Sequence, residues 1–145
     1  MIRKVAAASR ALENGDQTVT ETPKRILVVD DEEAIVLLLK TILNVYGYES
    51  LTAQTPQDGL SLAVKERPDA ILLDIAMADL DGYEVCRQLK ANPETATIPV
   101  IMISALALEQ DRKQALVSGA NGFILKPFDP KDVIAEIERL TQPRP

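Results

Sequence analysis

Short aliphatic runs alternate five times with segments of helical periodicity between residues 25 and 141. The runs that we predict as strands are residues 26–30, 48–52, 70–74, 99–104 and 122–125. In the intervening segments apolar residues recur three and four positions apart, as Ile35, Leu38, Leu39, Ile42 and Tyr46 do in the first of them, which is typical of helices. The chain is therefore predicted to have an α/β fold.

Two helix starts can be placed from local chemistry. Thr55 precedes Pro56, and Asp129 precedes Pro130. In both pairs a capping side chain stands before a proline that suits the first helical position.

The strands are mostly unbroken aliphatic runs, which predicts a parallel sheet covered by helices on both faces. Right-handed crossovers and reactive residues at strand ends favour the doubly wound order 2-1-3-4-5 for five strands, with a site at their carboxyl ends.

The first 23 residues differ from the rest of the chain. An Ala-rich, basic stretch reaches Leu12, and a polar run with several threonines follows it to Pro23. We interpret residues 1–23 as an N-terminal extension or linker, residues 24–141 as one domain, and residues 142–145 as a C-terminal tail.

Composition excludes several classes of function. The net charge of -6 and the pI near 4.7 disfavour direct binding to nucleic acid. No apolar run approaches the roughly 20 residues of a membrane span, so no membrane association is expected. The single cysteine agrees with a reducing, cytoplasmic compartment. The absence of histidine removes Ser/His and Cys/His catalysis.

Polar residues stand at the carboxyl ends of four predicted strands. Asp30 and Asp31 end the first strand, Asp74 the third and Ser104 the fourth, and Lys126 directly follows the fifth. Each alone has an ordinary structural explanation, such as helix capping or strand termination. The predicted topology, however, brings all of them to one edge of the sheet.

Three carboxylates at one partly buried edge repel one another, because two like charges at 4 Å cost about 4 kcal/mol at an effective dielectric near 20. One lysine cannot neutralise three acids, whereas a hard divalent cation such as Mg²⁺ can. A carboxylate, a hydroxyl and an ammonium beside such a cation form a site for phosphoryl transfer. Asp74 is the expected nucleophile because it ends the central strand.

Four ordered motifs resemble the receiver domain of two-component response regulators over residues 24–141. They are ILVVDDE from residue 26, LLDIAMADLDGY from residue 72, PVIMISA from residue 99 and GANGFILKPF from residue 119. The resemblance implies a flavodoxin-like fold. It also implies a signalling switch, not an enzyme acting on other substrates, that is phosphorylated on Asp74 by a sensor histidine kinase or a histidine phosphotransfer protein.

The resemblance further implies a bound Mg²⁺ or Mn²⁺. Its direct ligands would be Asp31, Asp74 and the backbone carbonyl of Ala76, with Asp30 acting through water. Lys126 would pair with the phosphoryl group, and Ser104 would hydrogen-bond it.

A conformational response is implied as well. Ser104 would move toward the new anion and the ring of Phe123 would swing inward. The change would remodel the face of the fourth helix, fifth strand and fifth helix, where a downstream protein would bind; homodimerisation is left open. The Lys126–Pro127 peptide is expected to be cis.

The chain departs from the family pattern at three positions. Ala78 replaces a common proline four residues after Asp74. Ala76 and Leu106 occupy positions that in the family help to position or block the hydrolytic water, and neither side chain can hydrogen-bond water. We therefore expect a long-lived phosphorylated form.

Three alternatives compete with this interpretation. A haloacid-dehalogenase-like phosphatase would need an aspartate at Ala76, and a flavin-binding protein would need a phosphate loop where Asp30 to Glu33 stand. The third is a pseudo-receiver of the same fold, never phosphorylated, that acts only as a docking module.

Overall fold

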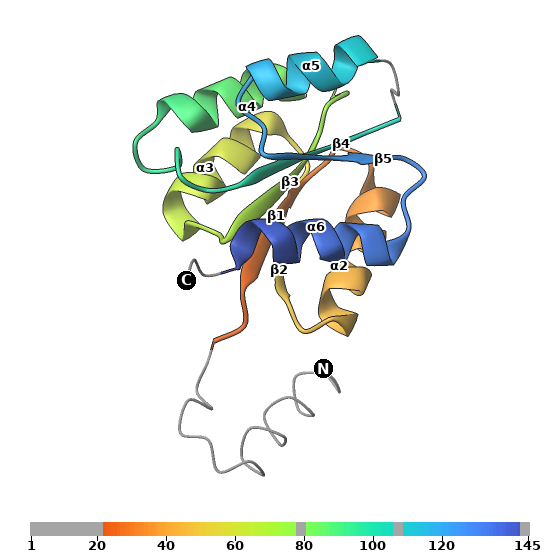
Figure 1. The fold of residues 1–145 in the computed structure, drawn as a ribbon. Helices are drawn as coiled ribbons and strands as arrows, with labels where there is room; N and C mark the ends of the chain where they lie inside the picture. The colour runs from red at the N-terminus through yellow and green to blue at the C-terminus, as the bar shows by residue number, and fades with distance from the viewer. Residues whose placement is uncertain (1–21, 78–80, 106–108, 143–145) are drawn as a thin grey trace.

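The computed structural model describes residues 22–77, 81–105 and 109–142. A five-stranded sheet lies at its centre, with parallel strands in the order β2-β1-β3-β4-β5 (Figure 1). The predicted class and strand order are confirmed. The strands are β1 (Arg25–Val29), β2 (Glu49–Ala53), β3 (Ala70–Asp74), β4 (Val100–Ser104) and β5 (Gly122–Leu125).

Helices cover both faces of the sheet (Figure 1). One face carries α2 (Glu33–Val45) and α6 (Pro130–Thr141). The other carries α3 (Pro56–Glu66), α4 (Gly82–Ala91) and α5 (Glu109–Val117). This arrangement buries the sheet on both sides, which explains why its strands are continuous aliphatic runs.

Both predicted helix starts are confirmed. The Thr55 side chain accepts a hydrogen bond from the Asp58 N–H at 3.1 Å and caps α3. Asp129 accepts one from the Lys131 N–H at 2.9 Å and caps α6. The prolines that follow the two caps are the first residues of their helices.

The core consists of two clusters separated by the sheet. Because successive side chains of a strand point to opposite faces, Leu27 and Val29 of β1 join the cluster under α3, α4 and α5. Ile26 and Val28 join the cluster under α2 and α6. Cys86 lies fully buried in the first cluster.

β1 ends one residue earlier than predicted, so Asp30 lies just beyond the strand. The Asp30 N–H still donates a hydrogen bond to the Ala53 carbonyl at 3.1 Å, which extends the alignment with β2 to this residue. Asp30 therefore keeps the rigid position of a strand residue while its side chain reaches the edge of the sheet.

The buried side of α2 differs from the apolar set singled out in the sequence. Leu39 and Ile42 face the core together with Val36 and Leu43. Leu38 and Tyr46 are exposed instead. The helix is apolar around most of its circumference, so its periodicity alone does not select a face.

The described part of the chain contains no helix long and apolar enough to cross a membrane. Ala78, Leu106 and residues 1–21, for which the sequence analysis gives expectations, lie outside the described residues.

Within the domain, the Lys24 ammonium donates a hydrogen bond to the Thr141 carbonyl at 3.0 Å, which joins the start of β1 to the end of α6.

Candidate metal centre at the strand ends

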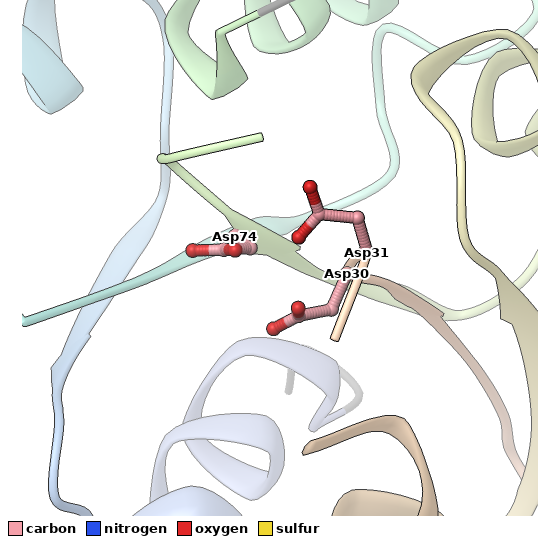
Figure 2. Close-up of side chains that lie close together, drawn as sticks. All are labelled: Asp30, Asp31 and Asp74. Atoms are coloured by element: carbon pink, nitrogen blue, oxygen red, sulfur yellow. The ribbon is translucent and has the colours of Figure 1, made fainter. Parts of the chain in front are cut away.

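Three aspartates gather where β1 and β3 end (Figure 2). One carboxylate oxygen from each of Asp30, Asp31 and Asp74 lies within 4.8 Å of the others. Asp30 and Asp74 are 1% and 3% exposed, whereas Asp31 is open to solvent. The cluster therefore has two buried members and one member on the solvent side.

The two oxygens of Asp30 have different surroundings. Oδ1 accepts a hydrogen bond from the Glu32 N–H at 2.8 Å. Oδ2 is buried and accepts no hydrogen bond from any described residue. Because a buried carboxylate oxygen without a hydrogen bond is costly, this atom is a suitable acceptor for a cation or for the hydration shell of one.

Burial dominates the electrostatics of Asp74. It raises the pKa of this carboxyl to about 6, helped by the negative charge of Asp30 and opposed by Lys126. The Ala76 N–H donates a hydrogen bond to Asp74 Oδ1 at 3.3 Å, which also favours the charged form. Burial likewise raises the pKa of Asp30, against the Glu32 N–H and the Lys126 charge. The site thus concentrates negative charge at a real energetic cost.

Lys126 is the cation that the fold brings to these acids. Its Nζ lies 3.6 Å from Asp30 Oδ2 and 3.6 Å from Asp74 Oδ1. Glu32 Oε1 lies 3.8 Å away, an approach that the sequence analysis did not anticipate. The run of four acids from Asp30 to Glu33 is the sequence signal for this approach.

The donor set fits a hard divalent cation. It consists of carboxylate oxygens, one of them buried without a hydrogen bond, and carries more negative charge than one lysine offsets. Mg²⁺ and Mn²⁺ prefer such oxygen ligands. Ala76, whose carbonyl is the further predicted ligand, directly follows this edge of the sheet and is exposed.

Ser104 and Phe123 lie on neighbouring strands and outside the acidic cluster. Ser104 is buried at the end of β4. The Lys126 N–H donates to the Ser104 carbonyl at 2.7 Å, which ties the end of β4 to the residue after β5. Phe123 is partly buried and packs against the core under α5. The Lys126–Pro127 peptide is cis, as expected.

Gly82 is a residue of this site to which the sequence analysis gave no role. Its N–H donates to the Ile75 carbonyl at 2.7 Å. A Cβ on Gly82 would lie 2.5 Å from the Asp74 carbonyl oxygen and 2.6 Å from Ile75 Cα. The start of α4 thus packs directly on the backbone that carries Asp74, and only glycine fits there.

Comparison with known proteins gives a consistent result. The family model for the response regulator receiver domain matches residues 26–138. The response regulator PleD of Caulobacter vibrioides is 47% identical over 118 residues, which are 81% of this chain and 26% of PleD. The DNA-binding regulator RpaA of Synechocystis is 40% identical over 116 residues, 80% of this chain and 48% of RpaA.

A solved structure also resembles this one closely. The receiver domain of the sensor histidine kinase PA1611 from Pseudomonas aeruginosa has a TM-score of 0.78 and 28% identity, covering 84% of this chain and all of that domain. That structure contains a magnesium ion coordinated in its active-site cleft. The chain spans well under two thirds of the length of the curated relatives it matches.

Proposed function

The chain belongs to the response regulator receiver domain family of two-component signalling, and from this premise we propose that it is a switch set by phosphorylation of Asp74. The donor is the phosphohistidine of a sensor histidine kinase or of a histidine phosphotransfer protein. One observation carries the proposal: a nearly buried carboxylate whose pKa is raised to about 6 lies 3.6 Å from a lysine and beside two more aspartates.

The reaction exchanges one bond to phosphorus for another. A carboxylate oxygen of Asp74 attacks the phosphorus, a P–O bond forms, and the P–N bond to the donor imidazole breaks. The bonding electrons leave with the imidazole nitrogen, which is then protonated by solvent. The attacking oxygen must be ionised, and above pH 6 most Asp74 carboxyls are.

Lys126 and Ser104 act on the transferred group. The Lys126 ammonium lies beside Asp74 and can pair with a phosphoryl oxygen after transfer. Ser104 is buried at the neighbouring strand end, from which its hydroxyl can donate a hydrogen bond to the phosphoryl group.

Asp31, Asp74 and the Ala76 carbonyl are the proposed direct metal ligands, and Asp30 contributes through water. When bound, a divalent cation reduces repulsion among the carboxylates and offsets charge on the phosphoryl oxygens. The fit of the donor set supports this assignment, and the magnesium-containing relative adds to it.

The surface that binds the downstream partner is the face made by α5, β5 and α6, which are the fourth helix, fifth strand and fifth helix of the domain. Leu116 and Val117 are exposed on α5, and Leu125 is exposed on β5. Apolar side chains at such a position suit a protein partner. We propose that a downstream protein, or a second copy of the chain, binds this face in the cytoplasm. The proposed receiver unit is residues 24–141.

Treatment of the protein with acetyl phosphate and Mg²⁺ tests the proposal. Intact-mass spectrometry should show one added phosphoryl group on the wild type and none on Asp74→Asn. Asp81→Asn is the matched control, because Asp81 is exposed and caps α4 outside the acidic cluster. A wild-type protein that gains no mass under conditions in which an established receiver is modified would indicate the pseudo-receiver docking module instead.

A further inference from the structure

Helix α5 buries little of its surface against the described part of the domain. Of its nine residues only Ala115 is buried, while Leu116 and Val117 are 67% and 86% exposed. Sparse apolar packing is characteristic of elements that move or open locally at low cost. The position of α5 must therefore depend on individual side-chain contacts.

Two such contacts reach α5 from the rest of the domain. The Tyr83 hydroxyl lies 3.4 Å from the carbonyl oxygen of Asp111 in the first turns of α5. The Arg112 guanidinium carbon lies 5.5 Å from the centroid of the Phe123 ring on β5, within the range of a cation–π contact. The first contact joins α4 to α5, and the second joins α5 to β5.

Tyr83 is also linked to the strand that carries the acceptor aspartate. It directly follows Gly82, whose Cα leaves no room for a side chain against the Asp74 carbonyl. The Gly82 N–H bonds the Ile75 carbonyl at 2.7 Å, so the first turn of α4 is fixed to the end of β3. A displacement at the end of β3 therefore moves the backbone on which Tyr83 stands.

We propose that Tyr83 and Arg112 form a latch that holds α5 in the position of the unphosphorylated protein. Tyr83 is a positioning residue: it acts through Asp111 of α5 and does not touch the acceptor. The inference rests on the proposed function and adds a second route from Asp74 to the output face, separate from Ser104.

The chemistry of the contacts suits a latch. Burial raises the pKa of Tyr83 above its usual value, with Asp111 and Asp81 adding to the effect, so the hydroxyl remains a donor throughout the physiological range. At 3.4 Å its hydrogen bond is long, and the Arg112 contact lies at the surface. Both contacts can be broken at modest cost.

Thermodynamic linkage predicts in which direction loss of the latch changes the affinity for a ligand. A contact made only in the resting state lowers the affinity for any ligand that favours the activated state, and removing that contact raises the affinity by the same factor. One hydrogen bond at the weak end of the usual range, or one exposed cation–π contact, corresponds to about twofold to fivefold. Variants without the latch should therefore bind a phosphoryl mimic more tightly than the wild type does.

Titration of the full chain with beryllofluoride in saturating Mg²⁺ tests this inference. Tyr83→Phe and Arg112→Gln should each raise the apparent affinity by about twofold or more. Tyr48→Phe and Lys113→Gln are the matched controls: Tyr48 packs in the other core cluster, and Lys113 is the exposed neighbour of Arg112. Both controls should titrate as the wild type does.

Hydrogen exchange of the unliganded variants provides the second measurement. Amides of residues 112–117 should exchange faster in Tyr83→Phe and Arg112→Gln than in the controls, while α2 and α6 keep their protection. A lower melting temperature with unchanged beryllofluoride affinity would make the contacts merely structural and overturn the latch. A wild type that binds no beryllofluoride would refute the proposed function itself, and the latch with it.

Discussion

Lys126 Nζ and Asp74 Oδ1 lie 3.6 Å apart, close enough for strong attraction but beyond the length of a good hydrogen bond. The lysine is drawn equally to Asp30, whose Oδ2 is also 3.6 Å away. The resting site is thus stabilised by one shared charge, and not by paired bonds with fixed geometry. Its stability should respond strongly to any change in local charge.

The first prediction concerns the coupling between these two residues. Lys126→Met leaves two buried carboxylates without their cation, so it should lower the free energy of unfolding by about 1–3 kcal/mol at pH 7.5 in EDTA. In an Asp74→Asn background the same change should cost clearly less, because one of the two charges is gone. Urea denaturation of the four proteins gives the coupling energy. Equal losses in both backgrounds would contradict the shared-charge description.

The second prediction follows from the raised pKa of Asp74. Its pKa of about 6 in the folded state exceeds the ordinary 3.8, so the folded state binds the proton more tightly and loses stability as pH rises through this window. About two pKa units correspond to about 3 kcal/mol. In EDTA, Asp74→Asn should therefore be nearly as stable as the wild type at pH 4 and more stable at pH 7.5.

Chemical denaturation across this pH range measures that difference. Addition of Mg²⁺ at pH 7.5 should reduce the difference in stability between Asp74→Asn and the wild type, since a cation stabilises the wild-type cluster more than a cluster with one carboxylate removed. Asp132→Asn, which changes an exposed carboxylate in α6, serves as the control and should show no comparable pH-dependent gain. A gap between Asp74→Asn and the wild type that stays constant from pH 4 to pH 7.5 would show that burial of Asp74 carries no such cost.

The third prediction concerns Gly82. Gly82→Ala places a methyl group against the Asp74 carbonyl and Ile75 Cα, and this backbone cannot rotate away as a side chain could. We expect a loss of about 1–3 kcal/mol in stability together with weaker Mg²⁺ binding, measured by calorimetric titration. Gly59→Ala is the matched control, because the three atoms nearest to its methyl group would all belong to the Val29 side chain and not to the backbone. Unchanged Mg²⁺ affinity in Gly82→Ala would remove Gly82 from the site.

The fourth prediction addresses the lifetime of the phosphorylated form. Ala76 is exposed beside Asp74 and its side chain cannot orient a water molecule. We expect the phosphoryl group to persist well beyond seconds in Mg²⁺, and Ala76→Asn to shorten its lifetime by adding an amide that can hold water. Loss of radiolabel from the purified phosphoprotein measures both. Decay of the wild type within seconds would refute the prediction.

The fold was predictable because the local signals agree with one another. Aliphatic strands, capped helix starts and acids at strand ends all indicate the same topology. Thr55 and Asp129 cap their helices as predicted. The buried side of α2 was not predictable, because Leu38 and Leu39 are equally apolar neighbours and only packing in the core cluster on this face of the sheet distinguishes them.

The candidate site was predictable as a set of residues but not as a geometry. Asp30, Asp31, Asp74 and Lys126 could be placed at one edge from strand order alone. The unequal surroundings of the two Asp30 oxygens depend on a turn at Glu32 that leaves no trace in composition. The role of Gly82 likewise depends on the close approach of two backbones, which arises only from the packing of α4 on the end of β3.

The hydrogen bond between Lys24 and Thr141 brings the beginning and the end of the proposed receiver unit into contact. Domains whose ends meet can be inserted into loops of other proteins, or rejoined in a new order, with little strain. The contact between Lys24 and Thr141 lies next to the first residue of β1, whereas the acids cluster beyond the last residue of the same strand. A short linker that joins these two ends would therefore allow the whole domain to be permuted or inserted into another protein without disturbing the acidic cluster.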